Sequence, residues 1–431
     1  MNTGSMSAKS ACDVLVVGGG AAGMMAALQA AWAGADVLLL EKNEKLGKKI
    51  YITGKGRCNV TNVAEIEDFL RAVPRNPRFL NASVRQFTSE DVVSTLEMLG
   101  TPTKVERGGR VFPVSDHASD VTRALSRGMS EAGVRVELHT AVSHIRKADG
   151  EFSVELERGG TLRTRSVIVA TGGLSYPSTG STGDGYAFAR ENGHTVTPLR
   201  GSLVGLTIDE KWPTLLQGLS LKNVRVSARV GKKRIFDEQG EMLFTHFGVS
   251  GPLILTLSSH LPDDPSAVEV TLDMKPALTP EQVDARLQRE FAESPRRQLS
   301  SVLLTLMPAR MGPVFASLCG LAPELPAGQI TRAQRMTIGA MLKAMPLHIS
   351  GMRPIEEAVV TRGGVEVKEI EPGTMMSRLV PGLFFAGEVL DVDAHTGGFN
   401  LQIAFSTGAL AGRSAARLAA GAVQGLKRQA G

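Results

Sequence analysis

Cysteine is scarce in this sequence, and the few cysteines present are not grouped. The chain of 431 residues has three of them, Cys12, Cys58 and Cys319, and no two form a C-x-x-C pair. Disulfide frameworks and structural zinc sites need paired or clustered cysteines, so the sequence argues against both and predicts no metal. Unpaired cysteines are typical of a reducing compartment, and we expect a cytoplasmic location.

The net charge is also small, and the sequence has few dense basic runs. Lys plus Arg number 48 and Asp plus Glu number 43, which gives a formal net charge of +5. The one dense basic run, residues 232–234, is short enough to be a solvated turn. No nucleic-acid partner is therefore expected.

The longest uncharged run lies at residues 14–35. Its 22 positions could cross a bilayer, which requires about 20 apolar residues. Thirteen of the 22 are Gly or Ala, however, so membrane insertion would be weakly driven. A buried strand followed by a closely packed helix explains the run better, and no membrane partner is expected.

The first forty residues have the pattern strand, turn, helix, strand. A β-rich run at 13–17 leads into GGGAAG at 18–23, and an Ala-rich helix is expected over 22–33, where Gly34 ends it. A second apolar strand at 36–40 ends in Glu41. This order predicts a βαβ unit with parallel strands.

The remaining chain predicts an α/β body that is interrupted by a second one. Helices are expected after Thr88 and at 118–132, and a buried strand at 166–170. Short alternating runs predict an antiparallel meander at 134–138, 142–145, 152–156 and 161–163. From residue 199 the runs change, with strands expected at 224–230, 253–257 and 268–272 and helices at 281–291, 299–306 and 331–344. The α/β pattern of the first region then resumes, with a strand expected within 381–388 and a helix at 400–420.

We therefore predict one α/β domain built from both chain ends, residues 1–198 and 357–431. The inserted domain, residues 199–356, is expected to hold a β-barrel and helices. The length supports two or three domains with sizeable cores.

The turn Gly18-x-Gly20-x-x-Gly23 between strand and helix predicts a dinucleotide site. Gly18 permits the tight turn, Gly20 lets the backbone approach a diphosphate, and Gly23 lets the helix pack on the sheet. The helix N-terminus, with Ala22 in its first turn, favours an anion. Glu41 can accept both ribose hydroxyls of an adenosine, with Lys42 beside it. The alternative is a packing turn with a surface glutamate.

Three later features favour FAD over NAD. A loop of Gly, cations and Asn at 47–59, which ends in Arg57, Cys58 and Asn59, suits a ligand that extends past the diphosphate. The pair Gly387-Glu388 offers a carboxylate for ribityl hydroxyls. GGFNL at 397–401 opens the last helix, whose N–H groups could stabilise negative charge on a flavin ring.

Six segments resemble a known family. They are VVGGGAAGMMAA, EKNEKLGKKIYITGKGRCNVTN, GRVFPVSDHASDV, ATGGLSYPSTGSTGDGY, LFTHFGVSGP and GLFFAGEVLDVDAHTGGFNLQ. Together they resemble the glutathione-reductase-type flavoproteins and, more closely, the BaiN or aminoacetone-oxidase-like family of FAD-binding proteins. The resemblance implies a Rossmann-like FAD-binding domain that an inserted domain covers.

The resemblance also implies roles for individual residues. Glu41 would bind the adenosine ribose, Glu388 the ribityl chain, and the backbone at Val142 the adenine edge. Asn400 and Leu401 would contact the pyrimidine end of the flavin, and Thr171 and Gly172 belong to the shared ATGG segment.

Several other residues have two interpretations each. Cys58 could be a redox thiol or a packed loop residue, and Arg57 a cofactor contact or a salt bridge. The candidate acid or base groups are His246, His348, His395 and Tyr176, each of which could instead be structural.

We expect an FAD-dependent oxidoreductase that transfers a hydride between a small organic substrate and flavin N5. The resemblance suggests oxidation of an amino-ketone-like amine or reduction of a conjugated double bond. No second G-x-G-x-x-G lies between a strand and a helix, so NAD(P)H is expected only as a transient electron donor. The alternatives are an RNA-modifying flavoprotein and a flavin-binding sensor with little turnover. The sequence leaves the oligomeric state open.

Overall fold

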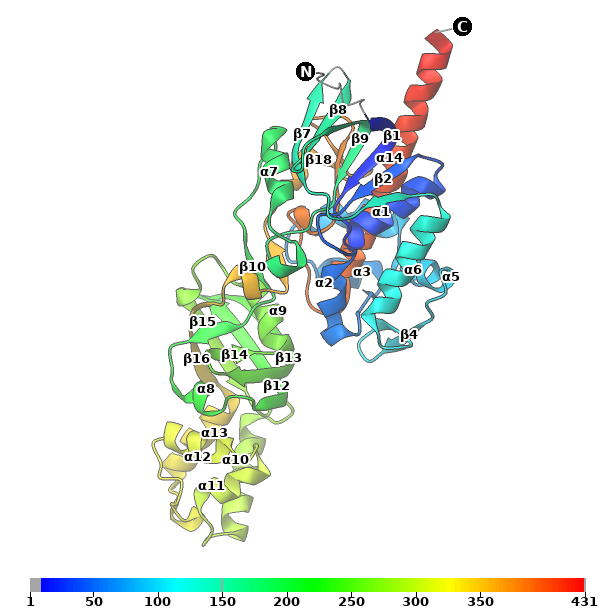
Figure 1. The fold of residues 1–431 in the computed structure, drawn as a ribbon. Coiled ribbons are helices and arrows are strands. Elements are labelled where there is room, and N and C mark those ends of the chain that lie inside the picture. Colours follow the sequence, from blue (N-terminus) through cyan, green and yellow to red (C-terminus); the bar gives the residue numbers. More distant parts are fainter. Residues whose placement is uncertain (1–8, 149, 430–431) are drawn as a thin grey trace. The chain divides into compact units, whose positions relative to one another are not determined.

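The computed structural model describes residues 9–148 and 150–429, and the chain divides into two compact units (Figure 1). Unit 1 contains the residues up to Ser202 and those from Ile355 onward, and unit 2 contains Leu203–Pro354. Each unit has a hydrophobic core of its own. The chain leaves unit 1 after strand β10 (Arg200–Ser202) and returns to it before β17 (Val360–Arg362), and these two strands pair antiparallel.

A nine-stranded sheet forms the centre of unit 1, in the order β18-β19-β20-β9-β1-β2-β6, with β7 and β8 extending from β9. Strands β20, β9, β1, β2 and β6 are parallel, as expected for a dinucleotide fold. The strands are β1 Lys9–Val17, β2 Val37–Leu40, β6 Arg135–Glu137, β7 Val142–Ala148, β8 Glu151–Leu156, β9 Thr161–Val169, β18 Ile370–Glu371, β19 Met376–Ser377 and β20 Leu383–Phe385.

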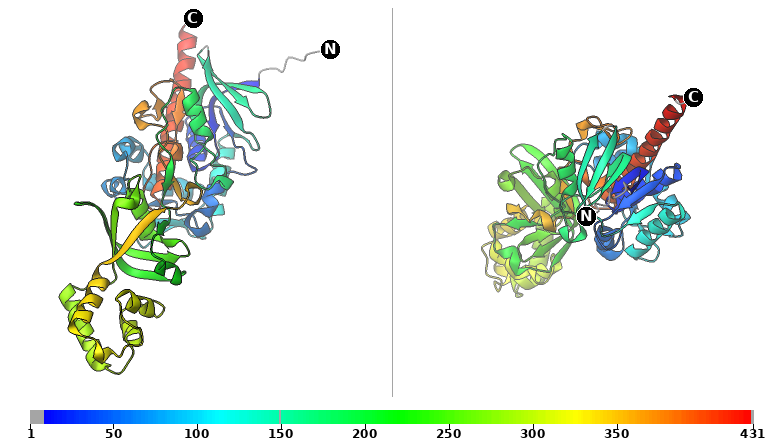
Figure 2. Two further views of the ribbon diagram at one scale, coloured as in Figure 1. Left: turned by 90° about the vertical axis from the view of Figure 1, so that its left-hand side faces the viewer. Right: turned by 45° about the horizontal axis from the view of Figure 1, so that its top comes forward.

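The first and last helices of unit 1 pack backbone to backbone. Helix α1 (Ala21–Trp32) is built almost wholly from small or apolar buried residues, and α14 (Phe399–Gln429) runs beside it (Figure 2). A Cβ atom at Gly408 or Gly412 of α14 would lie 2.3 or 2.2 Å from a carbonyl oxygen of α1. Glycine at these positions therefore allows the two chain ends to meet.

Further elements cover the rest of unit 1. Helix α5 begins with a capping box between Thr88 and Asp91. A small sheet holds β3 Thr61–Asn62, β5 Arg110–Pro113 and β4 Thr103–Glu106. The helices are α2 Lys48–Ile52, α3 Ile66–Arg71, α4 Asn81–Gln86, α5 Ser89–Met98, α6 Ala118–Glu131 and α7 Asp184–Glu191, with short 3-10 helices that include η1 Thr53–Gly56 and η9 Gly387–Val389.

A closed barrel forms unit 2, in the order β11-β14-β13-β12-β15-β16, and helices accompany it. This barrel and the α/β sheet of unit 1 confirm the predicted fold class. The strands are β11 Leu206–Ile208, β12 Ser220–Val230, β13 Lys233–Thr245, β14 Gly248–Ser250, β15 Val268–Asp273 and β16 Met345–Met352. The helices are α8 Trp212–Leu215, α9 Pro252–His260, α10 Pro280–Glu293, α11 Leu299–Val302, α12 Met311–Leu318 and α13 Arg332–Lys343.

Three local predictions were wrong. The run 253–257 is not a strand but part of helix α9, which follows Gly251 at φ +91° and starts with Pro252 in its first turn. The runs 161–163 and 166–170 are not separate, because β9 is one strand that pairs antiparallel with β8 and parallel with β1. The run 134–138 lies outside the meander, since β6 pairs parallel with β2.

Among the described residues, no helix is long and apolar enough to cross a membrane.

Candidate functional site

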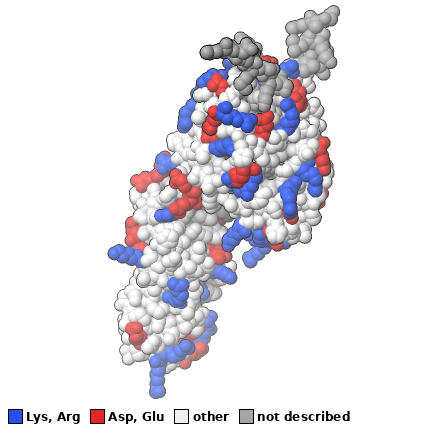
Figure 3. Space-filling view, in the orientation of Figure 1, with Lys and Arg blue, Asp and Glu red and all other residues white. Residues whose placement is uncertain are grey.

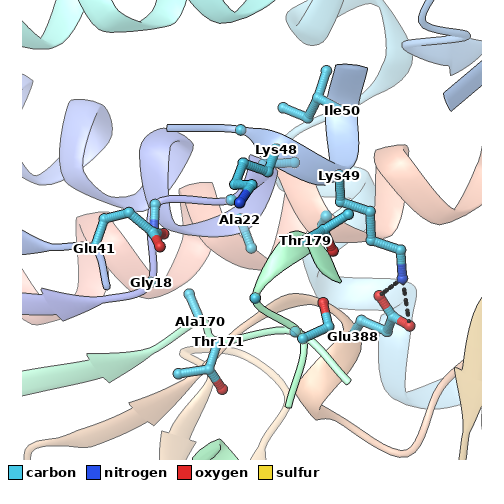
Figure 4. A pocket seen from close by; sticks show the side chains of 18 of the residues that line it. Gly18, Ala22, Glu41, Lys48, Lys49, Ile50, Ala170, Thr171, Thr179 and Glu388 are labelled. Carbon is cyan, nitrogen blue, oxygen red and sulfur yellow. Dashed lines mark hydrogen bonds and ion pairs between the residues drawn. The ribbon is translucent and has the colours of Figure 1, made fainter. Parts of the chain in front are cut away.

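A cavity opens in unit 1 where the parallel strands end (Figure 4). Val17 and Leu40 end β1 and β2, Ala170 and Ala386 follow β9 and β20, and all four line it. In doubly wound sheets, ligands bind outside the carboxyl ends of the strands. The cavity contains about 1300 Å³ of space, part of it open to solvent.

The glycine turn after β1 forms the middle of this cavity. Gly18 has φ +105°, and a Cβ there would lie 2.6 Å from the carbonyl oxygen of Ala170. A Cβ at Gly20 would meet no atom within 4 Å, because this backbone faces open space. A Cβ at Gly23 would lie 1.8 Å from the carbonyl oxygen of Gly18, so Gly23 serves the packing of α1 on the turn. The turn and the N-terminus of α1 therefore leave room for an anion beside bare backbone.

Glu41 stands at one end of the cavity and is 7% exposed. Its Oε2 accepts a hydrogen bond from the backbone N–H of Gly19 at 2.7 Å. Its Oε1 accepts from the backbone N–H and the Nδ2 of Asn43, at 2.8 and 2.6 Å. The carboxylate is therefore held in one orientation at the cavity wall. Lys42 also lines the cavity and pairs with Asp184 at 2.6 Å.

Glu388, in η9, lines the cavity away from Glu41 (Figure 4). Lys49 of α2 contacts both of its carboxylate oxygens, with Nζ at 3.0 and 2.8 Å. The Oγ of Ser175 and the backbone N–H of Thr361 also donate to Oε1, at 2.9 and 2.8 Å. Glu388 is thus bound to three separate segments of unit 1.

The start of α14 lies against the cavity, which Asn400 and Leu401 line. Gly397 and Gly398 precede the helix with φ +121° and +101°. The Asn400 side chain accepts from the backbone N–H of Ala394 at 2.9 Å, and it donates to the carbonyl oxygens of Ala394 and His395. This amide fixes the loop that leads into the helix.

Five buried side-chain oxygens lack a hydrogen-bond partner within the described part of the chain, and two of them belong to predicted cofactor residues. Thr171 Oγ1 is in the cavity wall. Asn59 lies outside the wall, with its Oδ1 3.0 Å from the position of a Cβ at Gly398. Buried polar atoms are normally satisfied. The open Thr171 oxygen in the wall, together with the bare backbone at Gly20, fits a polar ligand that runs along the cavity, as FAD would.

Most of the predicted cofactor residues lie together in the wall of this cavity. They are Gly18, Gly20, Ala22, Glu41, Lys42, Val142, Thr171, Gly172, Glu388, Asn400 and Leu401. Gly387 is not among them, and a Cβ at this residue would lie 2.7 Å from Cβ of Ala22, so it has a packing role like that of Gly23.

Arg57 and Cys58 lie outside the cavity wall. Arg57 forms ion pairs with Glu106 and Asp116, which raise its pKa, and its guanidinium lies 4.1 Å from the ring centre of Phe112. These contacts fit the second interpretation of Arg57, that of a salt-bridge residue. Cys58 is fully buried at φ +61°, and burial raises the pKa of its thiol to about 12, which fits the packed alternative.

The structure does not bring the candidate acid or base groups together. His395 is half-buried next to the start of α14, and its backbone N–H donates to Ala72. Tyr176 is half-buried at φ +52°. His246 is exposed in unit 2, edge-on to Phe247, and His348 pairs with Glu210 in the same unit.

Sequence reasoning missed the side chains that hold the two glutamates. Asn43 follows Glu41 by two residues, and its position beside a predicted ribose carboxylate was a usable signal. Lys49 belonged to the loop that favoured FAD but was one of several cations there. Ser175 and Thr361 had no signal, because the sequence does not show that their segments meet at Glu388.

Fold and cavity together define a flavoprotein of the dinucleotide-binding class, and comparison with known proteins gives its family. Residues 12–414 match the model of the HI0933-like protein Rossmann domain, and the chain belongs to this family. It is an FAD-dependent oxidoreductase.

Two curated relatives cover nearly all of the chain. The 3-dehydro-bile acid delta(4,6)-reductase of Clostridium scindens is 32% identical over 93% of this chain and 98% of its own length. The ribosomal RNA dihydrouridine synthase of Haemophilus influenzae is 31% identical over 91% of this chain and 96% of its own. Among solved structures, the 3-ketosteroid-delta4-(5alpha)-dehydrogenase of Rhodococcus jostii RHA1 matches with a TM-score of 0.48 and 16% identity, over 96% of this chain and 98% of that one.

Proposed function

We propose that the protein is an FAD-dependent reductase that adds hydrogen to an activated carbon–carbon double bond of a small organic substrate. The cavity supports the FAD part of this proposal, because Glu41, the glycine turn and the Glu388 region follow one another along a single wall (Figure 4). When bound, FAD supplies a two-electron carrier whose N5 takes up and gives off hydride.

Different residues of the cavity would bind different parts of the cofactor. In this proposal Glu41 would accept the adenosine ribose hydroxyls, and the turn at Gly18–Gly20 with the N-terminus of α1 would take the diphosphate. Glu388 would border the ribityl and flavin part. The first N–H groups of α14, near Asn400 and Leu401, would stabilise negative charge at the pyrimidine edge.

Reduction is favoured over amine oxidation by the names of the relatives. A delta(4,6)-reductase and a dihydrouridine synthase both add hydrogen to a ring double bond. In the overall reaction the substrate gains one hydride and one proton, and NADH or NADPH is oxidised to NAD⁺ or NADP⁺. The donor and the proton source stay predictions, with His395 and Tyr176 as the candidates for the latter in unit 1.

The second candidate is a flavoprotein that reduces uridine in RNA, which the dihydrouridine synthase relative supports. A protein that binds RNA usually gathers basic side chains on one face. On the face drawn in Figure 3, basic and acidic side chains of the described residues are interspersed instead. The small-molecule substrate is therefore our first candidate.

One anaerobic experiment distinguishes these functions. The purified protein is expected to be yellow, NADH or NADPH should bleach it, and a 3-oxo-4,6-diene steroid should restore the colour. Recovery with ribosomal RNA alone would favour the second candidate, and bleaching by aminoacetone would favour amine oxidation. A flavin that stays oxidised with every donor would indicate a sensor. A folded, colourless protein that does not take up FAD would overturn the proposal.

A further inference from the structure

Lys49 and Glu388 form an ion pair inside the cavity, although 339 residues separate them in the sequence. Lys49 lies in α2 and Glu388 in η9, and Figure 4 shows their side chains pointing toward each other. Their side chains are 23% and 19% exposed. Because water reaches them only in part, their charges are less screened than those of a surface pair.

The pair is fixed in place by uncharged groups. Ser175 Oγ lies 2.6 Å from Lys49 Nζ and 2.9 Å from Glu388 Oε1. The backbone N–H of Thr361 donates to the same oxygen at 2.8 Å. The Lys49 ammonium thus has three contacts, one with Ser175 Oγ and two with the carboxylate oxygens of Glu388. Because a lysine side chain is long and mobile, these contacts restrict it strongly. Both charges therefore have defined positions in the cavity wall.

The pair stands across the cavity from Glu41, beyond the glycine turn (Figure 4). If Glu41 binds the adenosine ribose and the turn binds the diphosphate, this region receives the flavin half of FAD. The inference rests on the proposed function in this respect.

We propose that the Lys49–Glu388 pair sets the reduction potential of the bound flavin. Two-electron reduction with uptake of one proton adds one negative charge to the flavin. The Lys49 ammonium favours that charge and the Glu388 carboxylate opposes it. The intact pair therefore holds the potential between the lower value that the carboxylate alone would give and the higher value that the ammonium alone would give.

This role predicts shifts of opposite sign. Lys49→Met leaves an uncompensated carboxylate, so reduction becomes harder and the potential falls. Glu388→Gln leaves an uncompensated ammonium, and the potential rises. We expect each change to alter the reduction equilibrium about tenfold, or ~30 mV for a two-electron couple. The double variant Lys49→Met/Glu388→Gln should return close to the wild-type potential.

The measurement is an anaerobic titration of the FAD-loaded proteins with dithionite in the presence of a reference dye. Lys48→Met is the matched control, because Lys48 also lines the cavity but contacts Asn43 and Glu44, both at 3.3 Å. Lys49→Arg keeps the charge. Both variants should stay near the wild-type potential.

Opposite shifts at Lys49 and Glu388, with little change at Lys48, would support the proposal. Shifts of the same sign, equal shifts at Lys48 and Lys49, or no shift would overturn it. Either single variant suffices if the other does not fold or load. Failure of the proposed function looks different, because the wild-type protein itself would then bind no FAD.

Discussion

Glu41 and Glu388 are both carboxylates at the edge of one cavity, and their different surroundings imply different tasks. Among the described residues, the hydrogen bonds that Glu41 accepts come from uncharged amides of Gly19 and Asn43. A carboxylate held by uncharged donors suits an acceptor for hydroxyl groups. Glu388 is neutralised by Lys49, so it can influence a neighbouring flavin without placing a net charge beside it.

Removal of the Glu41 carboxylate should weaken FAD binding. Hydrogen bonds to a charged acceptor contribute about 1.5–3 kcal/mol, so Glu41→Ala should raise the Kd for FAD roughly 10- to 150-fold. Titration of apoprotein with FAD, followed by quenching of flavin fluorescence, measures this. Glu44→Ala, at an exposed residue three positions later, is the control. Unchanged FAD affinity in Glu41→Ala would refute the ribose assignment.

His194 is the residue whose titration should affect stability. Its ring is buried between Glu369, at 3.1 Å, and Ser377, at 2.8 Å. Burial lowers its pKa, against the opposing effect of the Glu369 hydrogen bond. The unfolded chain therefore takes up the proton more readily than the folded protein.

The free energy of unfolding should consequently be flat above a pH of about 6.5 and should fall as the pH drops below it. Each unit by which the folded pKa is lowered contributes about 1.4 kcal/mol to that fall. Urea unfolding between pH 5 and 8 measures it. His194→Gln should be less stable at neutral pH but should lose part of the pH dependence. An identical dependence in this variant would exclude His194 as the cause.

At the scale of the elements, the turn between β1 and α1 contains two glycines with different predicted roles. Gly20 is predicted to let the cofactor approach, and Gly23 to let the helix pack. Gly20→Ala places a methyl group in open cavity space, so the fold should lose no more than about 1 kcal/mol, while FAD binding weakens. Gly23→Ala forces a Cβ against the carbonyl oxygen of Gly18 and should destabilise unit 1 by about 1–3 kcal/mol or more. Thermal unfolding and FAD titration of both variants distinguish the effects. Equal losses of stability in the two would contradict this division.

The local part of the site could be predicted from sequence because it lies within one βαβ unit. The glycine turn and Glu41 follow each other within about 25 residues, and the strand and helix patterns on either side are regular. The contacts of Glu388 could not be predicted, because Lys49, Ser175 and Thr361 come from three distant segments. Their meeting depends on how the whole sheet assembles.

The errors in the fold have local physical reasons. The apolar run at 253–257 is too short for its periodicity to separate a strand from a buried helix, and Gly251-Pro252 was the unused sign of a helix start. Strand β9 was divided in two because its first half alternates while its second half is uniformly buried. The change reflects different neighbours on one side, β8 for the first half and β20 for the second, while β1 pairs with both halves on the other side.

At the scale of the molecule, the described residues form two separate hydrophobic cores, and the cavity belongs to the first. Calorimetry should therefore resolve two unfolding transitions, only one of which depends on FAD. At a free FAD concentration of 100 times Kd, unit 1 gains about 2.7 kcal/mol. Gly23→Ala identifies the transition of unit 1, because it lowers that one. A single transition that moves as a whole would show that the units unfold together.

The cavity wall needs strand β20 and the start of α14, which follow the second unit in the chain. On the ribosome, the roughly 180 residues from Ser202 to the end of β20 emerge at about 5–20 per second, so the nascent first segment waits about 9–37 s for its missing strand. During this interval β9 has an open edge, the kind of surface that chaperones shield. The prosthetic group can be captured firmly only after β20 and the start of α14 have been synthesised.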